Sequence, residues 1–259
     1  MSLIISIDGN IGSGKSTILK HLRERLTGNK NYVFVDEPVK EWSKIEHDGI
    51  TILEKFYGNT EKYSFSFQMM AYITRLNMLK TAVKENPNAI IITERCLYTD
   101  KFVFAKMLYD QKQINPYEYQ IYNKWFDEFI SDLPEHKFFF IKSDPIKSKE
   151  RISKRKRAGE DNISIEYLSS CEEYHLEMYN KHLQNTIKVI DIESYNLESE
   201  SYNLLINDII SLMNKHIKKY SVINSYFQNF KLNNLVISSM FIILSGLYYS
   251  NKYKFFCKR

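Results

Sequence analysis

The sequence predicts a single α/β domain with a parallel five-stranded sheet and helices on both of its faces. Short apolar segments alternate along the chain with longer segments of helical periodicity. The apolar segments are continuous runs, which is typical of strands that are buried on both faces. A glycine-rich phosphate-binding motif follows the first of them and opens a helix. These three observations indicate a P-loop fold over residues 1–219, with a C-terminal extension over residues 220–259.

The first part of the chain contains three predicted strands and two predicted helices. The apolar run Leu3–Ile7 is the first strand, and Lys15–Leu26 follows it as a helix. Tyr32–Asp36 is the second strand. Helical periodicity then extends over Tyr63–Glu85, and the fully apolar run Ala89–Thr93 is the third strand. Strands that are separated by helices favour parallel pairing.

The second part of the chain continues this alternation and supplies two more strands. The expected helices are Tyr98–Tyr109, Pro116–Ile130, Ile146–Lys154, Ile165–His182 and Ser201–Lys219, and the expected strands are Lys137–Ile141 and Ile187–Asp191.

Composition and charge exclude several classes of protein. Charged residues make up 26% of the 259 residues, which is ordinary for a globular protein. The net charge of +5 suits an anionic ligand but is too small to indicate nucleic-acid binding by itself. The cysteines Cys96, Cys171 and Cys257 are too far apart for a metal motif or a disulfide framework. We therefore expect a reducing, cytoplasmic location and no nucleic-acid partner.

The C-terminal extension contains an uncharged run over residues 232–251 with a strongly apolar centre at residues 235–249. This is about the length of a membrane-spanning helix. Tyr248, Tyr249 and the basic residues after 251 resemble interfacial anchors, whereas several Asn and Ser residues dilute the run. A membrane anchor, a packed terminal helix and a disordered extension all stay open.

The phosphate-binding motif matches G-x-x-x-x-G-K-[ST] at every position. Its glycines allow successive backbone N–H groups to face phosphate oxygens at the start of a helix. Lys15 is expected to reach the β- and γ-phosphates, and the Ser16 hydroxyl to bind Mg²⁺. The motif alone does not separate kinases from GTPases and ATPases. The expected nucleotide-binding residues are Gly9, Asn10, Ile11, Gly12, Ser13, Gly14, Lys15, Ser16 and Thr17.

Four further motifs occur in a fixed order after the phosphate-binding loop. They are Asp36-Glu37-Pro38-Val39 with Trp42, Tyr57 with Phe65-Ser66-Phe67-Gln68, the segment Glu94–Asp100, and the basic segment Arg151–Arg157. In this combination the chain resembles the deoxynucleoside kinase family, in particular its deoxycytidine/deoxyguanosine kinase branch. The resemblance covers about residues 3–190.

The resemblance implies a catalytic group at the ends of two strands. Glu37 would be the general base for the substrate 5′-hydroxyl, and its place at the carboxyl end of a parallel strand suits that role. Trp42 would form a flat wall for the sugar or base. Glu94 would act on Mg²⁺, and Arg95 would contact the transferring phosphoryl group and orient Glu37. Cys96 stands where the family usually has serine.

The resemblance also implies a set of residues that hold the nucleoside. Gln68 would pair with the base edge, because a carboxamide offers both a donor and an acceptor. Tyr57 would hydrogen-bond the 3′-hydroxyl, and Phe67 and Phe104 would stack against the base. Ala71, one helical turn after Gln68, would keep the remaining wall small.

The basic segment resembles the family's lid. Arg155 and Arg157 would clamp the phosphates, and Glu160 would share the 3′-hydroxyl with Tyr57. Only one acidic residue stands where the family usually has two. Seven basic residues between Lys147 and Arg157 could alternatively form a nucleic-acid patch or a solvated helix face.

Arg75 and Asp100 match the Arg/Asp pair of the deoxycytidine/deoxyguanosine branch. Arg75 lies two helical turns after Gln68, on the same face. We expect Asp100 to hold Arg75 through a charge-assisted fork of two hydrogen bonds. Arg75 would then fill the space that the thymine methyl group needs, so thymidine should be disfavoured.

The expected activity is transfer of the γ-phosphate of ATP, or of another nucleoside triphosphate, to the 5′-hydroxyl of a deoxyribonucleoside. Mg²⁺ is the expected cofactor, and family resemblance implies a homodimer. Two alternatives remain: a nucleoside monophosphate kinase of the thymidylate kinase type, and a nucleic-acid- or membrane-associated binding protein. The preferred base and the preferred donor stay open.

Overall fold

The structure, a computed structural model, describes residues 2–196 and 199–218 of the chain. The chain divides into two compact units, Met1–Met213 and Asn214–Arg259. The first unit contains the sheet and all of the motifs described above. In the second unit the described residues, 214–218, are helical.

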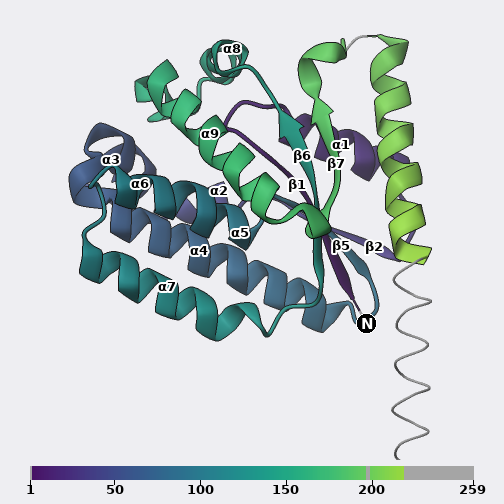
Figure 1. Cartoon of the computed structure of the whole chain (residues 1–259), viewed down its shortest axis with the longest axis horizontal. Helices are drawn as coiled ribbons and strands as arrows, with labels where there is room; N and C mark the ends of the chain where they lie inside the picture. Colours follow the sequence, from purple (N-terminus) through teal and green to yellow (C-terminus); the bar gives the residue numbers. More distant parts are fainter. Residues whose placement is uncertain (1, 197–198, 219–259) are drawn as a thin grey trace, which may run out of the picture. The chain divides into compact units, whose positions relative to one another are not determined.

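The first unit is built on five parallel strands in the order β2-β5-β1-β6-β7 (Figure 1). This confirms the predicted parallel sheet. Strand β1 is central, with β5 and β2 on one side and β6 and β7 on the other. Where the strand order reverses direction in this way, a crevice forms at the carboxyl ends of the strands. The strands are β1 (Leu3–Gly9), β2 (Tyr32–Val35), β5 (Ile90–Glu94), β6 (His136–Lys142) and β7 (Thr186–Asp191).

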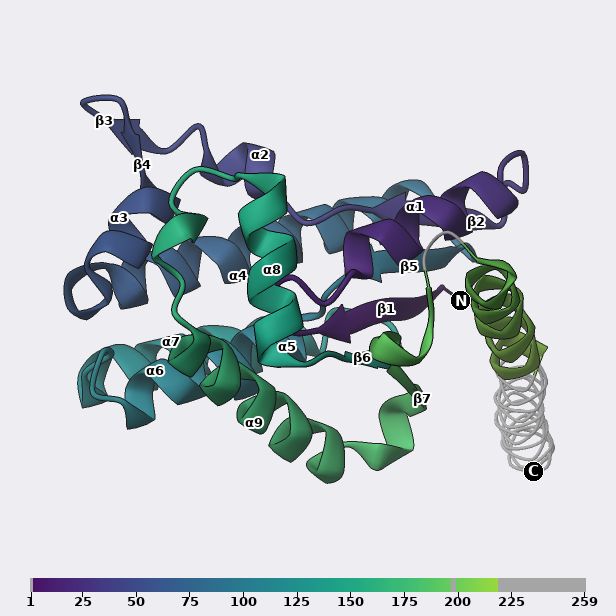
Figure 2. The same cartoon turned by 90° about the horizontal axis from the view of Figure 1, so that it is seen from above.

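Helices cover both faces of the sheet, as the sequence predicts. On one face, Ile4 and Ile91 form a core cluster with Tyr72 and Leu76 of α4 and Phe126 of α7. Figure 2 shows α1 and α9 on opposite sides of β1. The main helices are α1 (Lys15–Arg25), α4 (Thr60–Glu85), α7 (Pro116–Ile130), α8 (Pro145–Arg155) and α9 (Ile165–Lys181), and a further helix covers residues 200–218.

The predicted helix Tyr98–Tyr109 is a composite of three short pieces. It consists of α5 (Leu97–Thr99), the π-helical turn η1 (Asp100–Ala105) and α6 (Lys106–Asp110). A π-helical turn carries one extra residue per turn and is often found beside functional sites. Here it contains both Asp100 and Phe104.

The segment between β2 and α4 contains elements that the sequence pattern did not predict. Thr51 and Glu54 form a capping box at the start of α3, with Glu54 N donating to Thr51 Oγ1 at 3.3 Å. The elements are α2 (Val39–Trp42), β3 (Glu46–His47), β4 (Ile50–Thr51) and α3 (Ile52–Gly58). Three short 3₁₀ turns occur later, at η2 (Glu160–Asn162), η3 (Leu183–Asn185) and η4 (Ile192–Ser194).

Among the residues that the structure describes, no helix is both long and apolar enough to cross a membrane. The apolar run at 232–251, on which the anchor hypothesis depends, lies outside the described residues.

Candidate active site

The phosphate-binding loop connects β1 to α1 and requires glycine at close approaches to neighbouring backbone. A Cβ atom on Gly9 would lie 2.3 Å from the carbonyl oxygen of Ile141, and one on Gly12 would lie 2.5 Å from that of Ser148. Both glycines also have positive φ angles, +144° and +76°. The loop is therefore packed tightly against β6 and α8, and only glycine fits at these two positions.

Lys15 is buried at the base of this loop. Its Nζ atom donates to the carbonyl oxygen of Asn10 at 2.5 Å. Burial and the nearby Arg95 lower the pKa of Lys15 to about 7, although Glu94 and Glu37 oppose the shift. An ammonium group with such poor solvation gains strongly from an anionic ligand. A phosphate bound in this loop would stabilise the charged form of Lys15.

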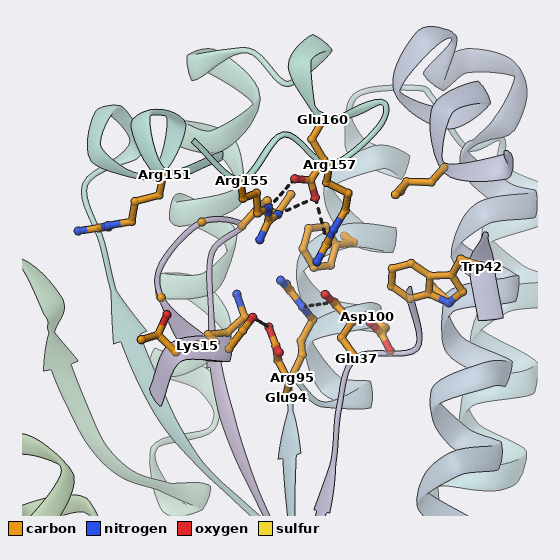
Figure 3. Close-up of a pocket in the computed structure, with 18 of the residues that line it drawn as sticks. Lys15, Glu37, Trp42, Glu94, Arg95, Asp100, Arg151, Arg155, Arg157 and Glu160 are labelled. Carbon is orange, nitrogen blue, oxygen red and sulfur yellow. Dashed lines mark hydrogen bonds and ion pairs between the residues drawn. The ribbon is translucent and has the colours of Figure 1, made fainter. Parts of the chain in front are cut away.

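Glu37 follows β2 and faces Arg95 (Figure 3), and a second arginine, Arg75 of α4, also contacts it. Arg95 Nε donates to Glu37 Oε1 at 3.2 Å, and Arg75 NH2 reaches the same oxygen at 3.4 Å. Burial alone would raise the pKa of Glu37, but Arg95, Arg75, Lys15 and Arg157 together lower it to about 2. The low pKa favours the ionised carboxylate, and the contact with Arg95 holds one of its oxygens.

Arg95 combines an unusual backbone conformation with an unpaired donor. Its φ angle of +67° is uncommon for a residue other than glycine and is typical of active-site positions. Its guanidinium lies over the ring of Phe104, 4.8 Å from the centroid. Within the described part of the chain, its buried NH1 group has no hydrogen-bond partner. That donor is available to an oxygen atom of a ligand.

Ser16 and Glu94 place a hydroxyl oxygen and a carboxylate side by side next to the loop. Ser16 Oγ donates to Glu94 Oε1 at 2.8 Å. A hydroxyl and a carboxylate are suitable ligands for Mg²⁺, which usually keeps waters and phosphate oxygens as its remaining ligands. The described residues contain no cluster of three or more His, Cys, Asp or Glu that could hold a metal alone.

An aromatic pocket lies on the other side of Glu37. Trp42 packs edge-on against Phe67, with ring centroids 5.4 Å apart, and Phe67 stacks on Phe56 at 4.5 Å. Gln68 is buried, and its side chain lines the cavity together with Ala71. Burial raises the pKa of Tyr57, so its hydroxyl stays protonated and can donate a hydrogen bond.

Arg75 and Asp100 meet in the interior, but not through the expected fork. Arg75 Nε donates to Asp100 Oδ2 at 2.9 Å, which is the single hydrogen bond between the two side chains. The NH1 group donates to the carbonyl oxygen of Glu94 at 2.8 Å, and NH2 faces Glu37. The fork prediction was wrong because the guanidinium satisfies three acceptors from different elements. Arg75 thereby connects the pocket to the carboxylate of Glu37.

The lid arginines bind a common carboxylate. Arg155 donates to both oxygens of Glu160 at 2.6 Å, and Arg157 NH1 donates to Glu160 Oε1 at 3.1 Å. Glu160 is 3% exposed, whereas both arginines keep part of their surface in solvent. Figure 3 shows this group above Arg95 and Glu37.

These groups surround one cavity of about 750 Å³. Every site residue predicted from the sequence lines this cavity except Gly9, Asn10 and Ser13. Eight further residues of the described part of the chain line the cavity but were not predicted as site residues. Arg151 belongs to the basic segment and could have been found from it, whereas no local sequence pattern marks the other seven. The additional lining residues are Leu53, Phe56, Arg151, Tyr167, Ile192, Tyr195, Asn196 and Tyr202.

Comparison with known proteins agrees with this geometry. The family model described as "Deoxynucleoside kinase" matches residues 5–218. A fowlpox virus protein named as a probable deoxycytidine kinase is 31% identical over 192 residues, covering 73% of this chain and 77% of its own. Deoxycytidine kinase 1 of Xenopus laevis is 31% identical over 192 residues, covering 66% of this chain and 71% of its own. The mitochondrial deoxyguanosine kinase of Xenopus laevis is 26% identical over 190 residues, with the same coverage.

The three functions that the sequence left open can now be separated. The family match spans the sheet, the phosphate-binding loop and the lid, so it covers the whole cavity. It supports phosphorylation of a nucleoside with ATP as the donor, rather than phosphorylation of a monophosphate or a role in binding alone. The chain belongs to the deoxynucleoside kinase family and is an ATP-dependent deoxynucleoside kinase.

Proposed function

We propose that this kinase phosphorylates deoxycytidine, deoxyadenosine or deoxyguanosine in preference to thymidine. The observation that carries the proposal is the buried Arg75–Asp100 pair next to Gln68. The guanidinium of Arg75 in this wall leaves little room for the thymine methyl group. Burial of that methyl group against a charged side chain would also not stabilise binding. Gln68 can offer a donor and an acceptor to any of the other three bases.

In the proposed reaction, Glu37 accepts the proton of the 5′-hydroxyl as that oxygen bonds to the γ-phosphorus of ATP. The bond from the γ-phosphorus to the β,γ-bridging oxygen breaks, and ADP leaves. Lys15, Arg95, Arg155 and Arg157 neutralise the charge on the transferring group, and such preorganised donors are usually a large part of catalysis. The low pKa of Glu37 means that its carboxylate is ionised, and so able to accept a proton, near neutral pH.

We propose that Ser16 and Glu94 hold Mg²⁺ together with phosphate oxygens of the donor. The cation would neutralise phosphate charge and orient the β- and γ-phosphates. The hydroxyl and carboxylate already lie within hydrogen-bond distance of one another, so both can reach one small cation or its bound water.

The base of ATP is proposed to lie at the end of the cavity opposite Trp42. Figure 3 shows Arg151 on the far side of Lys15 from Trp42. Ile192, Tyr195 and Asn196, from the turn after β7, line the same cavity. Arg151 is fixed there by Glu193, which accepts from its NH2 group at 2.8 Å.

We also propose that the enzyme is a homodimer, as in the family it resembles. An exposed apolar stripe on α7 supports this: Tyr117, Ile121 and Trp125 recur every four residues and are 80%, 45% and 42% exposed. Light scattering of the wild type and of Ile121→Lys tests the proposal, with a dimer expected only for the wild type. A wild-type monomer at micromolar concentration would contradict it.

The substrate proposal is tested with purified protein, ATP and Mg²⁺, using the four natural deoxyribonucleosides one at a time. At least one of deoxycytidine, deoxyadenosine and deoxyguanosine should have a higher kcat/KM than thymidine. A preference for thymidine over all three others would overturn the role given to Arg75 and Asp100.

A further inference from the structure

Helix α9 reaches the phosphate-binding loop from behind, through the side chain of Asn10. Asn10 is completely buried, and its Nδ2 atom donates to the carbonyl oxygen of Leu168 at 2.8 Å and toward Glu172 Oε2 at 3.4 Å. Its Oδ1 atom accepts from the backbone N–H of Ile11 at 2.8 Å. Two residues of α9 therefore use both amide hydrogens and fix the orientation of this side chain.

The backbone of Asn10 in turn supports the lysine that faces the donor phosphates. Its carbonyl oxygen accepts from Lys15 Nζ at 2.5 Å and from the backbone N–H of Ser13 at 3.3 Å. A rotation of the Asn10 peptide would move the Lys15 ammonium and the first turn of the loop together. The connection from Glu172 to Lys15 thus passes through one residue.

Glu172 is an unusual side chain to place at this position. It is 8% exposed, and its Oε1 atom has no hydrogen-bond partner in the described part of the structure. Burial raises the pKa of Glu172 to about 7, although Asn10, Lys142, the backbone of Ser143 and Lys15 oppose the shift. A buried polar atom without a partner costs free energy. The other oxygen of this carboxyl group, Oε2, contacts Asn10 of the phosphate-binding loop.

We infer that Glu172 is a positioning residue for the phosphate donor, which acts through Asn10 on Lys15. Glu172 does not line the cavity, so it has no direct contact with either substrate in this arrangement. Its effect should therefore fall on the donor and leave the nucleoside pocket unchanged. The inference rests on the proposed donor site at the phosphate-binding loop.

The contact between Glu172 and Asn10 determines which substitutions of Glu172 preserve it and which remove it. Oε2 acts as an acceptor for an amide hydrogen, and a glutamine side chain can present an oxygen at the same place without a charge. Glutamine is also close in shape to the protonated acid. Leucine keeps the volume but removes the acceptor, and aspartate keeps the acid but is one methylene group too short to reach Asn10.

The test compares Glu172→Gln, Glu172→Leu and Glu172→Asp with the control Glu173→Leu, in which the exposed neighbour on the same helix is changed. The leucine variant should raise the KM for ATP about tenfold, because a small displacement of a positioning group is costly in rate and binding. The aspartate variant should raise it less, and the glutamine variant should stay within about twofold of the wild type. The KM for the deoxynucleoside should stay within about twofold in all of them.

Two outcomes would overturn the inference: an unchanged KM for ATP in both the leucine and aspartate variants, or a glutamine variant as impaired as the leucine variant. The aspartate variant keeps the test valid if leucine prevents folding. Lys15→Ala, measured in parallel, separates this inference from the proposed function. An unchanged KM for ATP in Lys15→Ala would mean that the donor site itself is misplaced.

Discussion

At the scale of single residues, Glu37 is a carboxylate that burial would neutralise if it stood alone. Four cations from four parts of the chain reverse this effect and lower its pKa to about 2. A base must be deprotonated to act, so protonation of Glu37 would remove activity only below this pKa. We therefore expect no acidic limb from Glu37 in the pH–rate profile above about pH 4.

Glu37→Gln should lower kcat by about 10²–10⁴-fold and leave nucleoside binding largely intact, because the amide keeps the shape but cannot accept the proton. Steady-state kinetics and a separate binding titration would measure the two effects. If the variant retains more than about a tenth of the wild-type kcat, Glu37 is not the base.

The contact between Arg75 and Glu37 changes what is expected of variants at the specificity pair. Arg75→Met with Asp100→Ala should raise thymidine kcat/KM relative to deoxycytidine, because bulk and charge leave together. The double variant should also be slower with every substrate, because Glu37 loses one of its two arginine contacts.

Either single change should perform worse than the double change. Arg75→Met leaves Asp100 as an unpaired buried charge, at a cost of about 3–5 kcal/mol. Asp100→Ala leaves Arg75 with Glu37, 3.4 Å away, as its remaining carboxylate partner. The ratio of kcat/KM for thymidine and deoxycytidine, measured in all three variants, checks the prediction. An unchanged ratio in the double variant would remove the pair from base selection.

At the scale of elements, the sequence predicts what is encoded locally and misses what depends on contacts made far along the chain. The apolar strands and the loop Gly9–Ser16 have strong local patterns, so their positions and the residues at their ends were predicted. Elements as short as α2, β3 and β4 carry no periodicity. The π-helical turn at Asp100–Ala105 depends on packing against α4 and α9, which no local pattern shows.

Helix α8 ends in Arg155, to which we assign part of the phosphate clamp. Arg155 lines the cavity, whereas its neighbour Lys154 points to solvent. Arg155→Ala should lower kcat by about 10²–10³-fold, as expected when one preorganised donor to a developing charge is lost. Lys154→Ala is the matched control and should leave kcat unchanged. Equal effects of the two changes would indicate a general charge effect rather than a clamp.

At the scale of the whole molecule, the net charge of +5 is small, but its distribution is not even. Among the described residues, one cavity is lined by six cationic residues and by four acidic ones, Glu37, Glu94, Asp100 and Glu160. The cationic residues are Lys15, Arg75, Arg95, Arg151, Arg155 and Arg157. The sequence indicated the anionic ligand through motifs and not through total charge. The turn after β7 also lines the cavity, although it lies more than 170 residues after the phosphate-binding loop in the sequence. No local sequence pattern predicts a contact over that separation.

The last prediction concerns the C-terminal extension. All of the cavity-lining residues that the structure describes lie between Ile11 and Tyr202, so removal of residues 231–259 should leave kcat and both KM values nearly unchanged. If the apolar run at 235–249 is an anchor, the shortened protein should also move from the membrane pellet to the supernatant when cells are fractionated. Full-length protein that stays in the supernatant without detergent would contradict the anchor. A large loss of activity after truncation would instead show that the extension contributes to the catalytic unit.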